Sequence, residues 1–139
     1  MIKISKLTDY AVVVLTQLGR DSAVQTVAAL ADATGIPAPT VAKLLKPLTA
    51  AGLVVSHRGA NGGYALSLEP ERITVAAIIT ALEGPIAVTD CVGETDSACG
   101  VERLCPMRGN WAKINRAMQR ALEEVSLADM SAPSWPLAV

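Results

Sequence analysis

The sequence predicts a mainly helical protein with one short β-hairpin, and three observations lead to that fold class. Apolar residues recur at helical spacing in several separate stretches of the chain. Asn61-Gly62, a dipeptide typical of hairpin turns, lies between two short apolar runs. Hydrophobic residues make up 51% of the chain and aromatic residues only 3%, with no Phe, which indicates an aliphatic and mostly helical core.

The length of the chain and its charge distribution limit the number of domains and the kinds of function that it can have. Its 139 residues fit one domain, or one domain with an oligomerisation arm. No apolar run is long enough to cross a membrane and the start lacks a signal-peptide cleavage site, so we expect a cytoplasmic protein. Residues 1–68 carry six basic and three acidic side chains (net +3), and residues 69–139 carry six basic and ten acidic ones (net −4). A basic front and an acidic back fit a DNA-reading half joined to a regulatory half.

The first helix is predicted from about Ser5 to Leu18, and Gly19 would end it. Its apolar side is predicted to consist of residues at spacings of three and four: Leu7, Ala11, Val14, Leu15 and Leu18. The second helix starts at Thr26, which can cap it, and stops at Gly35.

The third helix is predicted from about Pro39 to Ala51, with Pro47 expected to kink or shorten it. Its inward face would hold Val41, Leu44, Leu45 and Leu48. Two short helices joined by a tight turn containing Gly match helix-turn-helix geometry, although any helical hairpin in a small bundle would look the same.

The next segment favours the DNA-binding interpretation. Two predicted strands, Leu53–His57 and Tyr64–Leu68, flank a turn from Arg58 to Gly63. A helix-turn-helix followed directly by a hairpin is the winged-helix layout. On the outer side of the third helix, Thr40, Lys43 and Lys46 would reach base edges or phosphates.

The tip of the wing carries a single cation among glycines. Arg58 next to Gly59 could enter the minor groove of A·T-rich DNA, where negative potential is concentrated. The alternative is a solvated arginine on a loop.

A further helix is predicted after Thr74 and would stop at Gly84-Pro85. The last predicted helix spans residues 106–128, and residues 129–139 read as a flexible tail. A heptad-like seam runs along this helix: Leu104, Met107, Trp111, Ile114, Met118, Ala121 and Val125. A long helix with one apolar stripe needs a partner, so we predict a homodimer; the alternative is packing on its own domain.

All three cysteines, Cys91, Cys99 and Cys105, lie in one loop without helical or strand periodicity, with seven and five residues between them. An odd number does not suggest a closed disulfide framework, whereas three thiolates suit a soft metal centre or an iron–sulfur cluster. Pro106 is suited to the first position of a helix, which would place Cys105 at a helix N-terminus. A zinc site and redox-active thiols remain alternatives.

The assembled pattern resembles the Rrf-two (IscR/NsrR-type) family of winged-helix iron–sulfur transcription regulators. The matching stretches are Lys6-Leu-Thr-Asp-Tyr-Ala11, Ala51-Gly-Leu-Val54, Arg58-Gly-Ala-Asn-Gly-Gly-Tyr64, Val75-Ala-Ala-Ile-Ile79 and the three cysteines. Glu83-Gly-Pro-Ile86 makes the chain most similar to the branch that regulates SUF iron–sulfur assembly genes. The resemblance implies a DNA-binding domain over residues 1–84, a cluster-binding loop over 85–105 and a dimerisation helix over 106–128.

The resemblance also implies a ligand set. Cys91, Cys99 and Cys105 would hold the cluster, a 2Fe-2S cluster in the first place with 4Fe-4S as the alternative. IscR-type members have a histidine three residues after the last cysteine, but Arg108 stands there and has no lone pair to offer. In NsrR-type members an aspartate at the position of Asp9 ligates the partner subunit's cluster. Glu94, Asp96 and Glu102, in the loop itself, are alternative acidic ligands.

The implied function is a homodimeric regulator, a repressor, that binds double-stranded operator DNA under control of its cluster. The residues do not suggest an enzyme, because there is one histidine, no paired acids in a plausible pocket and no Gly-rich phosphate loop. Two alternatives stand beside this function: a thiol-based redox regulator without a cluster, and a small iron–sulfur redox protein.

Overall fold

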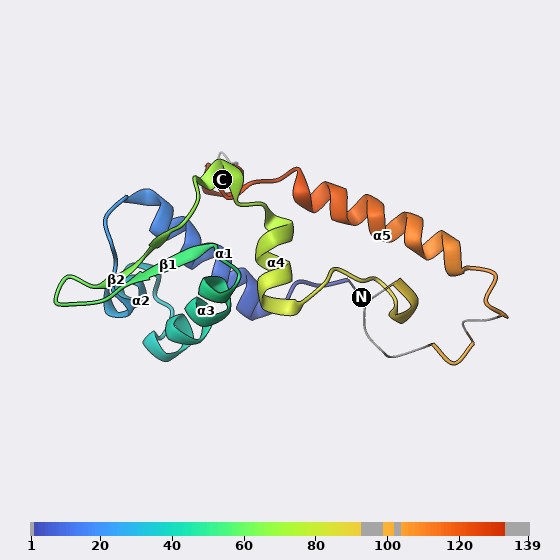
Figure 1. Ribbon diagram of the computed structural model, residues 1–139, viewed down its shortest axis with the longest axis horizontal. Coiled ribbons are helices and arrows are strands. Elements are labelled where there is room, and N and C mark those ends of the chain that lie inside the picture. The colour runs from blue at the N-terminus through green and yellow to red at the C-terminus, as the bar shows by residue number, and fades with distance from the viewer. Residues whose placement is uncertain (1, 93–98, 102–103, 133–139) are drawn as a thin grey trace, which may run out of the picture.

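The computed structural model describes residues 2–92, 99–101 and 104–132, and its mainly helical architecture with one hairpin confirms the predicted fold class (Figure 1). The elements follow in the order α1 (Lys6–Arg20), α2 (Val27–Thr34), α3 (Ala38–Ala50), β1 (Val54–His57), β2 (Gly63–Leu66), the 3-10 helix η1 (Pro70–Arg72), α4 (Val75–Glu83), the 3-10 helix η2 (Asp90–Val92), α5 (Arg108–Glu123) and α6 (Leu127–Ser131).

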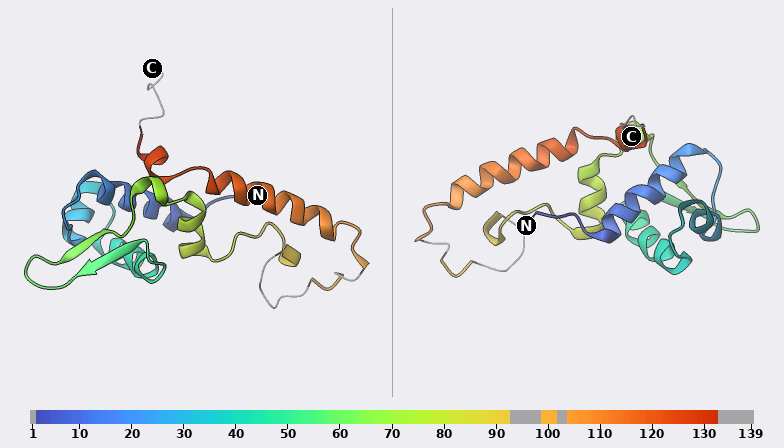
Figure 2. Two further views of the ribbon diagram at one scale, coloured as in Figure 1. Left: turned by 45° about the horizontal axis from the view of Figure 1, so that its top comes forward. Right: turned by 180° about the vertical axis from the view of Figure 1, so that it is seen from behind.

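The chain has a compact body and a projecting arm. Helices α1, α2, α3 and the hairpin form the body, and α4 stands at its side (Figure 1). Helix α5 extends away from the body, and the 3-10 helix η2, which contains Cys91, packs against it (Figures 1 and 2). Within its own chain α5 packs mainly against α4 and η2.

The core is aliphatic, as predicted, and the buried faces of the helices mostly consist of the predicted apolar residues. The predicted residues of α3, Val41, Leu44, Leu45 and Leu48, are all fully buried. The prediction for α1 was wrong at one position, because Thr8 is fully buried whereas Leu7 lies 36% exposed. A polar side chain can take the core position here because its hydroxyl has hydrogen-bond partners, described below.

The helix ends follow ordinary capping rules. Thr26 and Thr74 cap α2 and α4 with their hydroxyls, as predicted. Gly35 ends α2 in the left-handed conformation with φ 75°, which costs a glycine little. Helix α1 continues through Gly19 to Arg20, and α3 continues through Pro47 to Ala50, so neither residue ends its helix.

The predicted hairpin is present but its turn differs from the type that Asn-Gly favours. His57 pairs with Gly63, which leaves a five-residue loop rather than a two-residue turn. The Gly62 N–H donates to the Gly59 carbonyl over 2.9 Å, so Ala60 and Asn61 occupy the centre of the turn. Neither has positive φ, whereas the two-residue type I′ turn needs positive φ at both central residues.

The predicted long helix over 106–128 is divided in two. Helix α5 begins at Arg108, three residues after Cys105, so Pro106 does not start it and Cys105 lies outside its first turn. It ends at Glu123, and α6 follows, beginning at a capping box of Ser126 and Asp129. Hydrogen bonds from the Ser126 backbone and hydroxyl lower the pKa of the Asp129 carboxyl. The sequence signal for this break, Ser-x-x-Asp, was overlooked.

The part of the predicted tail that the structure describes is folded. Leu127 at the start of α6 is fully buried in the core cluster, and its N–H donates to the Ile73 carbonyl over 2.7 Å. Residues 133–139 lie outside the described part of the chain. The C-terminal end of the arm is thereby fastened to the body.

We predict that Leu127→Ala lowers the free energy of unfolding by about 2–5 kcal/mol, because it leaves a cavity in the core. Urea denaturation followed by circular dichroism measures this. Met130→Ala is the matched control on the same helix, since Met130 is 49% exposed and its loss should cost much less. Equal effects of the two substitutions would mean that α6 does not belong to the core.

Candidate nucleic-acid interface and cysteine loop

The outer side of α3 and the wing carries the predicted DNA-contacting residues. Lys43 and Lys46 on α3 are exposed, and Thr40 is half-buried. Arg58 and Gly59 at the wing tip are exposed as well. No acidic side chain belongs to α3, so nothing on this helix neutralises its two cations. An exposed helix with adjacent cations is suited to phosphate contact and to the major groove.

The wing is fixed to the body by a third extended segment. Gln25, just before α2, exchanges backbone hydrogen bonds of 2.9 and 2.8 Å with Tyr64 on β2. Gly63 permits this contact, because a Cβ there would lie 2.5 Å from the Gln25 carbonyl oxygen. The wing therefore projects from a three-segment base, which limits where the Arg58 side chain can reach.

The three cysteines follow α4 in the chain, and Cys91 lies next to α5. Cys91, in η2, is half-buried, and its Sγ lies 3.2 Å from the Thr89 hydroxyl oxygen. Cys91, Ala112 and Asn115 are among the residues around a cavity of about 470 Å³ between η2 and α5. Cys99 and Cys105 are also half-buried, and all three thiols are free.

The donor chemistry of the loop fits a soft metal or an iron–sulfur cluster, because three partly shielded thiols are present and none is used in a disulfide. Within the described residues of one chain, no three His, Cys, Asp or Glu side chains are assembled to hold a metal ion. The alternative acidic ligands Glu94, Asp96 and Glu102 lie outside the described part of the chain, as does the side chain of Arg108.

Asn115 on α5 holds the lead-in to this loop and was not predicted from the sequence. It is buried, its Nδ2 donates to the Ile86 carbonyl over 3.1 Å, and its Oδ1 accepts from the Val88 N–H over 3.0 Å. One side-chain amide thus provides hydrogen-bond partners for two backbone groups, the Ile86 carbonyl and the Val88 N–H, of the segment between α4 and η2. Its sequence signal is weak, because an asparagine beside an apolar seam reads as a surface residue.

Helix α5 has two faces with different surroundings. Ala112, Asn115, Met118 and Leu122 turn toward the chain's own residues and are buried or half-buried. The adjacent face is apolar but exposed: Met107 is 47%, Trp111 41% and Ile114 45% exposed. Leu104, just before the helix, is 91% exposed and continues that stripe. The predicted seam is therefore mostly uncovered in a single chain, and Met118 belongs to the inner face.

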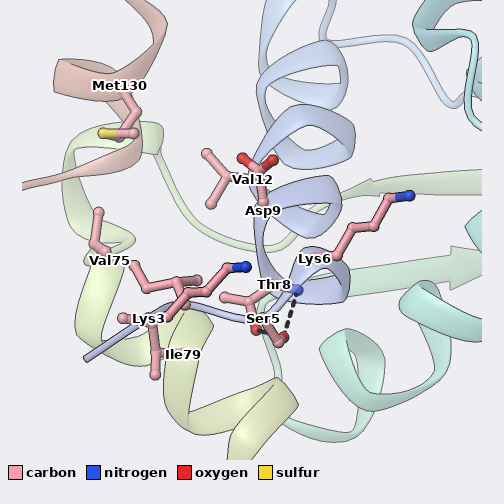
Figure 3. Close-up of a pocket in the computed structure, with 10 residues that line it drawn as sticks. Lys3, Ser5, Lys6, Thr8, Asp9, Val12, Val75, Ile79 and Met130 are labelled. Carbon is pink, nitrogen blue, oxygen red and sulfur yellow. Dashed lines mark hydrogen bonds between the residues drawn. The ribbon is translucent and has the colours of Figure 1, made fainter. Parts of the chain in front are cut away.

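Asp9 lies on α1, exposed, at a groove of about 700 Å³ between the N-terminal segment, α1, α4 and α6 (Figure 3). The groove has an apolar side formed by Val12, Val75, Ile79 and Met130. Its lining contains no cysteine of the same chain. Within the described residues of one subunit, Asp9 and Cys91 therefore line different cavities.

A hydrogen-bonded chain next to Asp9 connects α1 with the end of α4. The Thr8 hydroxyl donates to Glu83 Oε2 over 2.8 Å, and Ser5 Oγ lies 3.0 Å from Thr8 Oγ1 (the Ser5–Thr8 pair is drawn in Figure 3). Since the Thr8 proton points to Glu83, the Ser5 hydroxyl donates to Thr8. Glu83 directly precedes the segment that leads to the cysteines, so this chain joins the DNA-binding half to the start of the loop.

The profile of the Rrf2 family, described as iron-dependent transcriptional regulators, matches residues 4–133. The chain belongs to the Rrf2 family. As an Rrf2 member it is a DNA-binding transcription regulator with a winged helix-turn-helix, and not an enzyme. None of the helices in the described ranges is long and apolar enough to span a bilayer.

Curated relatives of this Rrf2 protein include the transcriptional regulator CymR of Bacillus subtilis, 38% identical over 89 residues. That match covers 64% of this chain and 59% of CymR. The transcriptional repressor NsrR of Streptomyces coelicolor is 30% identical, over 78% of this chain and 72% of NsrR.

Solved structures show the same Rrf2 architecture. The structure of CymR, the global cysteine regulator of B. subtilis, matches with a TM-score of 0.72 at 30% identity, covering 95% of this chain and 98% of that one. T. potens IscR matches with a TM-score of 0.67 at 30% identity, over 93% of this chain and 85% of that one.

We predict that Asn115→Ala releases the segment before the cysteine loop. Two backbone groups lose their partner, which should cost about 1–3 kcal/mol. Hydrogen–deuterium exchange should become faster at Val88 and at neighbouring amides. Asn110→Ala, at an exposed site in the first turn of α5, is the control and should leave these amides protected. Unchanged exchange at Val88 in Asn115→Ala would show that the amide does not hold this segment.

Proposed function

We propose that this protein is a homodimeric repressor whose affinity for double-stranded operator DNA is set by an iron–sulfur cluster on Cys91, Cys99 and Cys105, and that it regulates SUF iron–sulfur assembly genes. The observation that carries the proposal is the presence of three free, half-buried thiols in an Rrf2 chain, with Cys91 next to α5. The assignment to SUF genes rests on the sequence resemblance, with Glu83-Gly-Pro-Ile86 before the loop.

The exposed stripe of α5 supports the dimer. Leu104, Met107, Trp111 and Ile114 form one uncovered apolar strip on an arm that projects from the body. Packing two such strips against each other would remove them from water and place the two cysteine loops near the dimer interface.

We predict that Ile114→Glu yields a folded monomer, because a carboxylate would then lie in the centre of the packed strips. Size-exclusion chromatography with light scattering measures the mass, and circular dichroism checks the fold. Lys113→Glu, the neighbouring exposed residue, is the control and should remain a dimer. A dimeric Ile114→Glu protein would place the interface elsewhere.

The cluster requires a ligand beyond the three cysteines. A bound iron–sulfur cluster would supply a redox- and iron-sensitive centre whose loss removes the bonds that hold the loop. The three thiolates would come from one chain, and we propose that Asp9 of the second copy supplies the fourth ligand. Asp9 is exposed at an open groove, and no cysteine of its own chain lines that groove. Its alternative role is a solvated acid near the helix start.

Thiol-based control without a cluster is the second candidate function. Its support is that Cys91, Cys99 and Cys105 are all free thiols, and that Cys91 Sγ lies 3.2 Å from the Thr89 hydroxyl oxygen. CymR of B. subtilis, a relative of similar fold, is described as a global cysteine regulator.

Anaerobic purification with an absorbance spectrum and iron and sulfide assays tests the cluster. We predict that the wild type carries iron and sulfide, and that Asp9→Ala loses the cluster faster in air and changes its spectrum. Asp32→Ala, an exposed acid on α2, is the control and should match the wild type.

The outcomes separate the candidates. A protein without iron and sulfide, whose DNA affinity instead responds to oxidants or thiols, would support thiol control. An Asp9→Ala protein with an unchanged spectrum, cluster stability and DNA response would remove Asp9 from the ligand set while leaving the cluster in place.

A further inference from the structure

The outward face of α3 combines small apolar residues with cations. Its outermost side chains, spaced at helical intervals opposite the buried face, are Pro39, Ala42, Lys43 and Lys46, and all four are exposed. Thr40 is only half-buried at the edge of this face. The N-terminal half of the face is therefore occupied by Pro39 and Ala42, which carry no side-chain donor or acceptor.

The outward face of α3 carries few residue types that can recognise a particular base in the major groove. The major groove presents hydrogen-bonding groups on every base pair, and thymine alone adds a methyl group. Reading cytosine requires an acceptor such as Glu or Asp, and reading adenine is best done by Asn or Gln. None of these residue types occurs from Ala38 to Ala50. A methyl side chain matches the thymine methyl by apolar contact.

Resting on the proposed docking of α3 in the major groove, we propose that Ala42 is a specificity-determining residue that selects thymine through its C5-methyl group, with Pro39 extending the apolar contact. Lys43 directly follows and donates to guanine O6 and N7 or to a phosphate. Lys46, about one turn further along α3, is placed to contact a DNA phosphate. The operator half-site then contains a thymine that cannot be replaced by cytosine without loss of affinity.

Ala42 is the residue of this face best placed to contact the thymine methyl group. It lies one turn into the helix, between Pro39 and Lys46 on the same side, so it occupies the centre of the exposed stripe. Val41 and Leu44, its neighbours toward the core, are fully buried and anchor the helix at this height. A short side chain there brings the backbone of α3 close to the floor of the groove.

The test starts from random-sequence DNA duplexes, from which the purified wild-type dimer selects its binding sequence. In the selected duplex each thymine is then replaced, one at a time, by uracil, which lacks only the methyl group. At one position of each half-site, we expect affinity to fall about fourfold, the value of one buried methyl-sized group. Placing 5-methylcytosine at that position should recover part of the affinity lost on substitution by cytosine.

Variants assign the effect to Ala42. With Ala42→Gly the uracil effect should vanish at that position, whereas Ala50→Gly, at the far end of α3, should retain it. With Ala42→Glu the selected base should change from thymine to cytosine, because a carboxylate accepts from cytosine N4. Arg58→Ala is expected to weaken binding to all duplexes and to lower the salt slope by about one.

The possible results distinguish this inference from the function on which it rests. If uracil binds as well as thymine at every position, or if the uracil effect persists in Ala42→Gly, Ala42 does not read the methyl group although the protein binds DNA. If no duplex from the library is bound under any cluster or redox state, the docking of α3 itself is wrong.

Discussion

The side-chain amide of Asn115 determines where the cysteine-bearing segment lies relative to α5. Through its bonds to Ile86 and Val88 it fastens the chain that leaves α4 to the inner face of the long helix. With that face committed to the chain's own residues, the neighbouring face with Trp111 and Ile114 remains apolar and uncovered. The two faces of α5 therefore differ in role. The face with the buried Asn115 amide holds the segment that leads to the cysteines, and the face with Trp111 and Ile114 presents an apolar surface to the outside.

Local sequence periodicity predicted most of the body and failed where distant contacts decide. The inward face of α3 follows a 3.6-residue repeat, so it could be identified without a structure. Thr8 could not, because its burial depends on Glu83, which lies 75 positions later. The division between α5 and α6 was locally encoded by Ser126 and Asp129, but the continuing heptad pattern outweighed that signal.

The candidate site shows the same division. The exposure of Lys43, Lys46 and Arg58 followed from their places off the apolar stripe and on a glycine-framed turn. The relative positions of Cys91, Cys99 and Cys105 could not be predicted, since a loop without repeating spacing leaves them undetermined. On the outward face of α3, Pro39 and Ala42 have no side-chain rotamers to order, so any contact that they make carries almost no entropic cost.

The arm is attached to the body at its inner end. There the Val75 N–H donates to the Val125 carbonyl over 2.9 Å and Leu127 enters the core, while Asn115, halfway along α5, holds the segment that leads to the cysteines. A straight helix of 16 residues is about 24 Å long. It therefore acts as a lever with its pivot at the body: by simple geometry, a tilt of about 5° at the pivot moves the far tip by about 2 Å. The same relation holds in reverse. If the cysteines and the tip of α5 move by an ångström or two, the body that carries α3 rotates by a few degrees relative to the arm.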